Sequence, residues 1–256
     1  MSEPENLSLF SHPKTSEKIQ SLLPENFKGL KILDLGAGQG GFTQRLYGQI
    51  QQTGEQPETV ITACDLFPED YLYSKIPCQK IDVNGRFPFE DDQFDTVISI
   101  EVIEHLPDQF HFIEEIARIT RPGGTAFIST PNILNANGRL RYFFTGTWPL
   151  FDILPIASHN VIHVSGHIAP ISLYYMYYFA KRAGFRECRF HVDRKKRSAL
   201  LLAPFIYAVN KLLSAKFTSR RKLKKGDAYE ENLPVIKALN SFDTLLGRTI
   251  IMEAIK

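Results

Sequence analysis

The sequence predicts an α/β fold in which helices cover both faces of a doubly wound, parallel sheet. Short apolar runs rich in β-branched residues recur along the chain, and segments with helical spacing lie between them. One run breaks into four glycines between Gly36 and Gly41, as a buried strand does when it turns tightly into a helix beside a ligand. Ligands of open α/β sheets bind at the carboxyl edge of the strands. Acids lie at or just beyond that edge in four predicted strands: Asp34, Asp65, Asp82 and Glu101.

The composition is that of an ordinary globular protein, with 43% hydrophobic and 23% charged residues. A chain of 256 residues is long enough for one sizeable domain, or at most two small ones. The three cysteines are far apart and form no C-x-x-C pair, so we expect reduced thiols rather than disulfides or a zinc site. The polar first residues do not resemble a secretory signal, and the longest apolar run, 199–209, is shorter than the ~20 residues of a membrane span. We expect a cytoplasmic protein.

Basic residues are concentrated in one part of the chain, although the net charge is only +2. Between Lys181 and Lys225 there are fifteen Lys or Arg and two acids, which is half of all the basic residues. This asymmetry points to a partner surface.

The first half of the chain alternates strands and helices at the spacing of parallel β-α-β units. Phe42, Leu46 and Ile50 recur every four residues, which predicts a helix that ends near Gly54. In order, the predicted elements are helix 15–23, strand 31–35, that helix, strand 59–65 and strand 79–83.

The second half begins with a predicted fourth strand at 94–100. Asp108 is placed to cap the helix that follows, and an apolar stripe ending at Ile119 marks the buried face of that helix. The sequence Arg121-Pro-Gly-Gly124 stops it. The remaining predictions are strand 125–130, helix 173–183 with Ser172 as its cap, strand 185–192 and a closing strand at 247–255.

Two segments interrupt this alternation. The first, 132–170, contains several aromatic residues and three histidines, and we expect a lid over the carboxyl edge of the sheet. The second, 194–246, is basic and amphipathic. We predict a single domain over 1–256 made of a core at 29–131 and 171–193, these two insertions, and a closing strand at 247–256.

The glycine run by itself fits two cofactors. Gly36, Gly38 and Gly41 match the G-x-G-x-x-G pattern of dinucleotide sites, whereas Asp34, Gly36, Gly38 and Gly40 match the D-x-G-x-G-x-G loop for S-adenosylmethionine. Asp65 lies where an acid could hold ribose hydroxyls in either class, so it does not discriminate.

Longer stretches discriminate between the two. The sequence resembles the class I S-adenosylmethionine-dependent methyltransferases, and within them the broad subgroup with ubiquinone-pathway O-methyltransferases and many small-molecule and glycan methyltransferases. The resemblance covers residues 30–185. It implies a Rossmann-like, seven-stranded sheet whose C-terminal strand is antiparallel and inserted between the fifth and sixth, and an enzyme that uses S-adenosylmethionine. It rests on Ile32–Gly40, Phe87–Leu106, Arg121–Gly124 and Ser129–Asn132, with weaker echoes at Gly166-His-Ile and Gly184-Phe185.

The resemblance also implies roles for individual residues along this edge. The methionine part of the cofactor would lie in the cradle of Asp34, Gly36, Ala37, Gly38 and Gly40. Asp65 would hold the ribose hydroxyls, with Leu66 against the adenine. Asp82 and Val83 would meet the amino edge of the adenine, although Asp82 could also be a plain acid at a strand end. Ile100 and Glu101 would line the methyl end.

An oxygen acceptor is favoured, because Glu101-Val-Ile-Glu-His105 stands where amino-group methyltransferases of nucleobases carry Asn/Asp-Pro-Pro-Tyr. His167 is the candidate base or substrate contact, and the alternative is a histidine that is hydrogen-bonded within the lid. On a helix, Glu101, Glu104 and His105 would share a face and could bind a divalent ion with His159, His163 or His167, as in relatives with a similar motif. Many similar relatives have no metal, and we predict none.

The expected partner is a small-molecule or glycan acceptor. The basic stretch 194–225 contains an apolar segment flanked by cations, which suits an anionic membrane surface and an acceptor on a lipid carrier. A helix packed on the sheet with solvated charges is the alternative. Nucleic acid is disfavoured because no RNA-binding module accompanies these cations, and no stable protein partner is inferred. Other functions left open are a non-catalytic cofactor-binding or membrane-tethered subunit, an NAD-dependent oxidoreductase and an RNA 2′-O-methyltransferase.

Overall fold

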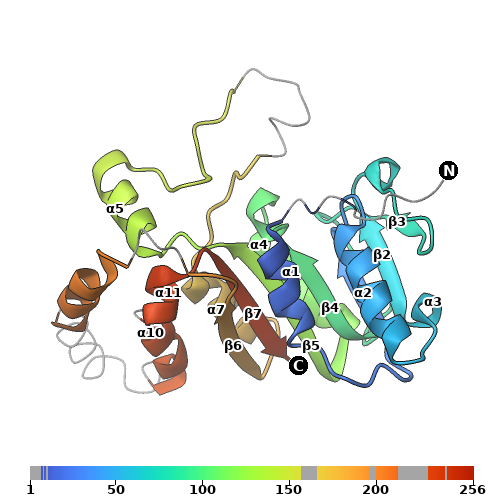
Figure 1. Cartoon of the computed structure of the whole chain (residues 1–256). Helices are drawn as coiled ribbons and strands as arrows, with labels where there is room; N and C mark the ends of the chain where they lie inside the picture. The colour runs from blue at the N-terminus through green and yellow to red at the C-terminus, as the bar shows by residue number, and fades with distance from the viewer. Residues whose placement is uncertain are drawn as a thin grey trace.

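A computed structural model describes residues 7, 9, 11–156, 166–195, 200–212, 230–239 and 241–256 of the chain. Its centre is one seven-stranded sheet with the order β3-β2-β1-β4-β5-β7-β6 (Figure 1). The predicted α/β fold is therefore confirmed. The strands are β1 (Ile32–Leu35), β2 (Ile61–Asp65), β3 (Cys78–Lys80), β4 (Phe94–Ile100), β5 (Thr120–Pro131), β6 (Glu187–Val192) and β7 (Thr249–Ile255).

The direction of the strands agrees with the expected topology. From β3 through β2, β1 and β4 to β5, neighbouring strands of the sheet pair in parallel. Strand β7 runs antiparallel to both β5 and β6. Strand β1 lies between β2 and β4, so the strand order reverses at this point and opens a crevice at the carboxyl ends of β1 and β4. The glycine run follows β1 and therefore lies at that crevice.

Alternating side chains of the strands fill two cores, one on each face of the sheet. Leu33 and Val97 belong to one buried cluster, and Ile32 and Ile98 belong to the other. Neighbouring residues of a strand point to opposite faces, so a sheet covered on both faces requires near-continuous apolar strands. That requirement explains the uninterrupted apolar runs in the sequence.

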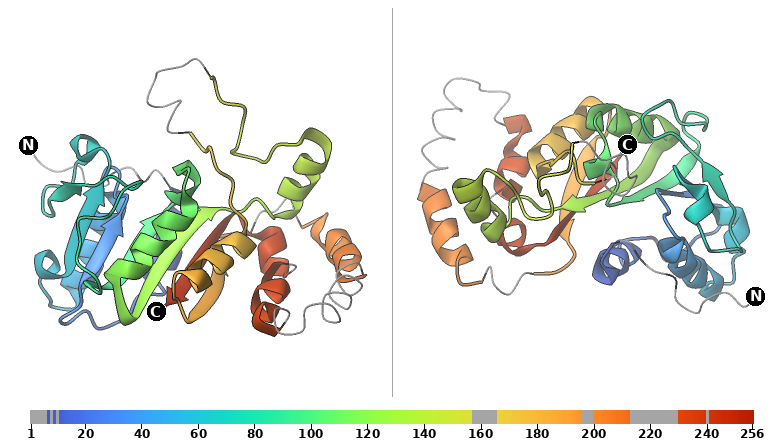
Figure 2. Two further views of the ribbon diagram at one scale, coloured as in Figure 1. Left: turned by 180° about the vertical axis from the view of Figure 1, so that it is seen from behind. Right: turned by 90° about the horizontal axis from the view of Figure 1, so that it is seen from above.

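Helices cover the two faces, as Figure 2 shows from behind and from above. On one face lie α1 (Pro13–Gln20) and α2 (Gly41–Gln52), and on the other lie α4 (Gln109–Ile119) and α7 (Leu173–Arg182). The short helix α3 (Pro57–Val60) leads into β2.

The remaining helices gather beyond the β6 and β7 end of the sheet (Figures 1 and 2). They are α5 (Ala136–Thr145), α10 (Leu233–Leu239), α11 (Phe242–Leu246) and a helix at 203–212. Among the described residues, two small buried clusters hold them, one around Ala203 and Leu245 and one around Val235. Within the described ranges, no helix has the length and apolarity needed to cross a bilayer.

Several predicted boundaries need correction. Helix α1 covers 13–20 rather than 15–23, and β3 covers 78–80 rather than 79–83. Strand β2 starts at Ile61 because Pro57 opens a helical turn that the β-branched residues at 59–60 complete. Strand β5 starts at Thr120, so the Arg121–Gly124 turn lies within the strand.

The two predicted helix caps behave differently. Asp108 caps α4, since its side chain accepts a hydrogen bond from the backbone N–H of His111 at 3.0 Å. Ser172 occupies the cap position of α7, but its side chain makes no capping hydrogen bond, so that prediction was wrong. The predictions for 157–165, 196–199 and 213–229 lie outside the described residues.

Candidate functional site

The glycine run forms a tight loop between β1 and α2. Gly36, Gly38 and Gly40 have φ angles of 83°, 54° and 88°, which glycine adopts readily and other residues rarely do. A Cβ on Gly36 would lie 2.4 Å from Cγ2 of Val102, and the backbone N–H groups of Gly36 and Ala37 both donate to the carbonyl oxygen of Cys64. Glycine is thus required at these positions by the positive φ angles. At Gly36 it is also required by the close approach of Val102, which follows β4.

Asp34 lies beneath this loop and is almost fully buried. Its Oδ2 accepts a hydrogen bond of 2.6 Å from the hydroxyl of Thr43 in the first turn of α2. Burial raises the pKa of Asp34 to about 7, and the Thr43 hydroxyl opposes this shift. Thr43 was missed by the sequence reasoning, although a polar residue on the buried face of a predicted helix was a usable signal.

Asp65, at the end of β2, is joined to the loop by hydrogen bonds. Its Oδ2 accepts from the backbone N–H of Gly38 at 2.8 Å, and its Oδ1 accepts from that of Phe67 at 2.9 Å. The carboxylate therefore holds the shape of the glycine loop from the neighbouring strand.

A small cavity opens above the loop. It is lined by several of the predicted cofactor residues and by others that were not predicted. Leu9 and Ser11 come from the segment before α1 and cover the cavity from the other side. No sequence motif pointed to them, because only the packing of that segment over the loop brings them there. The lining residues are Leu9, Ser11, Asp34, Gly36, Ala37, Gly38, Gln39, Gly41, Phe42 and Ile100.

The other predicted cofactor residues lie around this cavity rather than in its lining. Asp82 is exposed, and its Oδ1 accepts from the backbone N–H of Asn84. Val83 is buried in the core cluster that also contains Leu35. Leu66 is partly buried immediately after β2. Their contact with an adenine stays a prediction.

Glu101 follows β4 in a strained conformation, with φ at 55°. Its backbone N–H donates to the side chain and the carbonyl of Ser129, and its Oε1 accepts from the hydroxyl of Thr249 at 3.2 Å. Burial raises its pKa. This positive φ prevents a continuous helix, so the expected shared face of Glu101, Glu104 and His105 was wrong: only a single 3-10 turn, η2 (Ile103–His105), follows.

A different trio converges beside η2. Ligand atoms of Glu104, His105 and His167 all lie within 4.8 Å of one another. The backbone N–H groups of Ile168 and Ala169 both donate to the carbonyl oxygen of Glu104, which holds the segment after His167 against η2. His159 and His163, the other candidate ligands, lie outside the described residues.

Glu104 is completely buried, and neither carboxylate oxygen has a hydrogen-bond partner among the described residues. Burial raises its pKa to about 8, and the neighbouring hydroxyl of Thr130 opposes this shift. A buried, uncompensated carboxylate is costly, so this group calls for a proton or a cation. One carboxylate and two imidazoles form a donor set that suits a divalent transition metal or zinc.

His167 packs against two rings, with centroid distances of 4.8 Å to His105 and 5.3 Å to Phe151. Its Nδ1 is buried without a hydrogen-bond partner among the described residues. Burial, aided by the nearby His105, lowers the pKa of His167, and a hydrogen bond to the backbone of Leu150 opposes this shift. The neutral imidazole therefore predominates at neutral pH, and the ring is also hydrogen-bonded within the predicted lid segment, as the alternative interpretation expected. Such a ring can accept a proton.

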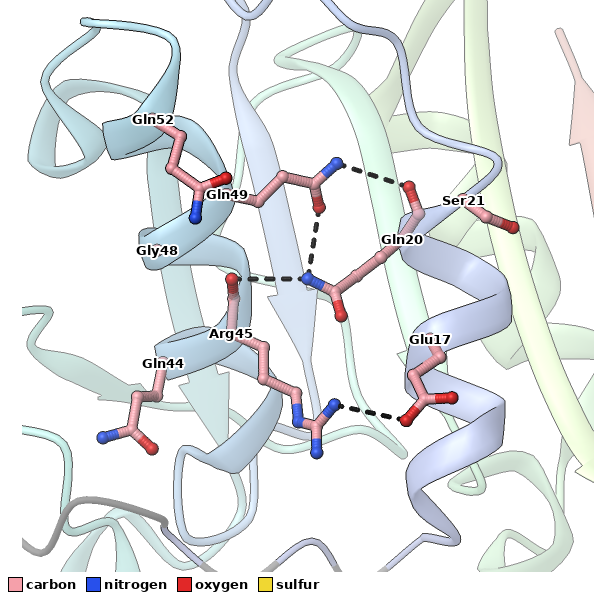
Figure 3. Close-up of a pocket in the computed structure, with 8 residues that line it drawn as sticks. All are labelled: Glu17, Gln20, Ser21, Gln44, Arg45, Gly48, Gln49 and Gln52. Atoms are coloured by element: carbon pink, nitrogen blue, oxygen red, sulfur yellow. Dashed lines mark hydrogen bonds and ion pairs between the residues drawn. The ribbon is translucent and has the colours of Figure 1, made fainter.

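A second hollow lies between α1 and α2 and is polar (Figure 3). The side-chain amide of Gln20 donates to Oε1 of Gln49 and to the carbonyl oxygen of Arg45, and Arg45 approaches Glu17 at 3.9 Å. These groups satisfy one another across the two helices, so we assign the hollow to helix packing.

Comparison with known proteins identifies the family to which this chain belongs. The profile of a family described as a methyltransferase domain matches residues 10–186, which include the glycine loop, η2 and His167. The chain belongs to this methyltransferase family. Its seven-stranded fold is also that of a SAM-dependent methyltransferase from Archaeoglobus fulgidus, with a TM-score of 0.56, 15% identity and coverage of 94% of this chain and 93% of that one.

Curated relatives of this methyltransferase match over a shorter region. A ubiquinone biosynthesis O-methyltransferase from Coxiella burnetii is 30% identical over 136 residues, 52% of this chain and 56% of the relative. A chloroplastic tocopherol O-methyltransferase from Arabidopsis thaliana is 34% identical over 110 residues, 41% of this chain and 31% of the relative. The matches span about half or less of these relatives.

Proposed function

We propose that the chain transfers a methyl group from S-adenosylmethionine to an oxygen of a small-molecule, glycan or lipid-linked acceptor. One observation carries the proposal. Ile100 lines the cavity over the glycine loop, and Glu104 and His105, which converge with His167, follow Ile100 in the chain by a few residues. This proximity supports a donor site beside a proton-accepting site at the switch point of the sheet.

The donor would lie in the cradle of Asp34 and Gly36 to Gly40, with its ribose at Asp65. When bound, its sulfonium supplies a methyl group that is already electrophilic. The protein's task is to hold the acceptor oxygen in line with that methyl group and to take its proton. His167 is the proposed base, because its ring is neutral at neutral pH and its Nδ1 is available in a buried site.

The choice of oxygen is supported by the names of the relatives, two of which are O-methyltransferases for ubiquinone biosynthesis and for tocopherol. That this chain also methylates an oxygen acceptor is our proposal. We propose that the protein acts in the cytoplasm.

Isothermal titration calorimetry with S-adenosylhomocysteine and with NADH tests the cofactor. We expect binding of the former and none of the latter, and the reverse would favour an NAD-dependent oxidoreductase. Transfer of a tritiated methyl group to phenolic, glycan and lipid-linked acceptors tests the reaction. Tight binding of the donor without any methylated product across these acceptors would favour a non-catalytic cofactor-binding subunit.

A metal-assisted form of the same reaction is a second candidate, favoured by the buried and unpartnered carboxylate of Glu104. A divalent cation at Glu104, His105 and His167 would compensate this charge and lower the pKa of an acceptor hydroxyl. Metal content after incubation with Zn²⁺, Mn²⁺ or Mg²⁺ and dialysis is the measurement. If this second candidate is right, the wild type and His111→Gln, which replaces a histidine of α4, should retain about one equivalent, and Glu104→Gln should lose it. No retained metal in any of them would leave His167 as a metal-free base.

A further inference from the structure

Large apolar side chains are exposed on two helices beyond the β6 and β7 end of the sheet. On α5 these are Phe143 and Phe144, and on the helix at 203–212 and the turn before it they are Leu201, Phe205 and Leu212. Each of these five side chains is between 71% and 88% exposed. We call these five residues the apolar end surface. Soluble domains rarely expose so many large apolar groups together, and such patches mark interaction sites.

The two helices lie side by side in each view (Figures 1 and 2). Ala136 of α5 and Ala203 belong to one buried cluster with Leu245 of α11, which accounts for the inner sides of both helices. Phe205 and Leu212 are seven residues apart, which places them on one face of the helix at 203–212, and Leu201 lies in the turn before it. The exposed side chains therefore point away from the body of the molecule.

The apolar character continues toward the candidate active site. Ile153 and Ile156, in the segment that follows α5, are almost completely exposed. The same segment contains Phe151, which is buried against the ring of His167. The segment after α5 thus carries both exposed apolar side chains and a ring in contact with the proposed base.

The charges around this surface favour an anionic partner. From Arg194 to Lys225 the sequence contains eleven Lys or Arg and no Asp or Glu. Of the described basic residues nearby, Arg194 is paired with Asp193, Lys195 with Asp243 at 3.1 Å and Arg141 with Asp152 at 2.6 Å. The other nine cations of the 194–225 stretch lie within the helix at 203–212 or on either side of it in the sequence, and no Asp or Glu lies among them.

We propose that the apolar end surface docks in the plane of an anionic lipid bilayer, with the flanking cations at the head groups. Apolar anchors that enter the interface and basic residues around them are the two components of peripheral membrane binding. Docking would present a lipid-linked acceptor to the site at His167, and this last step alone rests on the proposed function.

Two other occupants fit the observations less well. A second copy of the chain in a two-fold dimer would pair the helix at 203–212 with itself, and the sequence around this helix carries eleven cations and no acid to complement them. A nucleic acid would match the charge, but Leu201, Leu212, Ile153 and Ile156 are aliphatic and offer neither hydrogen bonds nor rings on which bases stack.

Flotation of the full chain with vesicles tests the proposal. We expect binding to phosphatidylcholine vesicles with one quarter phosphatidylglycerol, at least tenfold weaker binding to pure phosphatidylcholine, and a similar loss in 0.5 M NaCl. The double variants Phe143→Ser/Phe144→Ser and Leu201→Ser/Phe205→Ser should each weaken binding to the anionic vesicles at least tenfold. Leu72→Ser is the matched control, since Leu72 is exposed near β3 at the other end of the sheet and should bind as the wild type does.

Circular dichroism and S-adenosylhomocysteine binding of the same variants show whether they fold and keep the donor site. This separates failed docking from failure of the proposed function, because vesicle binding is scored without any methyl transfer. Failure of the wild type to bind anionic vesicles, or unchanged binding by both serine variants, would overturn the proposal. So would a concentration-dependent dimer that these variants abolish in the absence of vesicle binding.

Discussion

The centre of the sheet and its β6 and β7 end are built differently. At β1 and β4, in the centre, the candidate donor site is formed by backbone: a glycine loop with three left-handed residues, fixed by Asp65 and Cys64 and supported by two large buried clusters. At the β6 and β7 end, short helices rest on two small clusters and leave large apolar side chains exposed. A site for a common cofactor needs backbone geometry, whereas an acceptor surface can be assembled from side chains on added segments.

The largest effect is expected where the two regions meet, at His167. His167→Ala should lower turnover by about 10² to 10⁴-fold, the usual contribution of a positioned base, while the affinity for S-adenosylhomocysteine stays within about twofold. Steady-state kinetics and calorimetry measure the two quantities. His111→Ala, whose ring contacts the carbonyl oxygen of Gly85, is the control that should keep its turnover. Unchanged turnover in His167→Ala would remove the proposed base.

Gly36→Ala should damage the donor region selectively. The new Cβ would meet Val102 at 2.4 Å in a residue with φ at 83°, so we expect a loss of about 2–4 kcal/mol of unfolding free energy and a large loss of donor affinity. Gly54→Ala has a similar φ of 84° but nothing within 4 Å of its Cβ, and it should lose only about 1 kcal/mol. Urea unfolding and calorimetry provide both values. Equal losses in the two variants would contradict the role of the Val102 contact.

Asp34 should make the stability of the donor region depend on pH. Its pKa is raised from 3.8 to about 7 in the folded protein, so the folded state holds a proton that the unfolded chain has already lost. Stability contributed by this proton is present below about pH 4 and is lost as the pH rises to about 7. Asp34→Asn cannot titrate, so its stability relative to the wild type should rise across that window by about 2–4 kcal/mol.

Urea unfolding at half-unit steps of pH measures this difference. Thr43→Ala is the partner variant, because losing the hydroxyl that opposes the shift should move the window to higher pH. A constant difference between Asp34→Asn and the wild type from pH 4 to 8 would show that the carboxyl group is not buried in a protonated form.

The smallest expected effect is a difference in the stability that buried leucines contribute in the two regions. Leu46 and Leu245 are both fully buried, the first in a large cluster under α2 and the second in the small cluster under α5. Leu46→Ala should cost about 3–5 kcal/mol, and Leu245→Ala about 1–2 kcal/mol less, because a small cluster can collapse around the cavity. Thermal unfolding of both variants tests this difference, and a larger loss in Leu245→Ala would reverse the comparison.

The donor region could be predicted from local sequence because its signals are local. Glycines at alternate positions, a buried strand before them and Asp108 at a helix start each depend on the conformation of a few neighbouring residues. Helix α5 was not predicted, because its apolar residues face outward and form no stripe that indicates a core. The expected capping hydrogen bond of Ser172 is missing for a related reason. A capping residue type indicates where a helix can begin, and not whether its side chain makes the capping hydrogen bond.

The sequence by itself determined the class of fold, the position of the glycine loop and the acids at the strand ends, since the positions of strands and tight turns follow from apolar periodicity and glycine spacing. Only the tertiary structure decided that Leu9 and Ser11 line the cavity and that the candidate ion-binding trio includes His167 rather than Glu101. It also revealed which apolar side chains remain exposed at the far end of the sheet. These features depend on contacts between residues that are far apart in the chain, and no local pattern encodes such contacts.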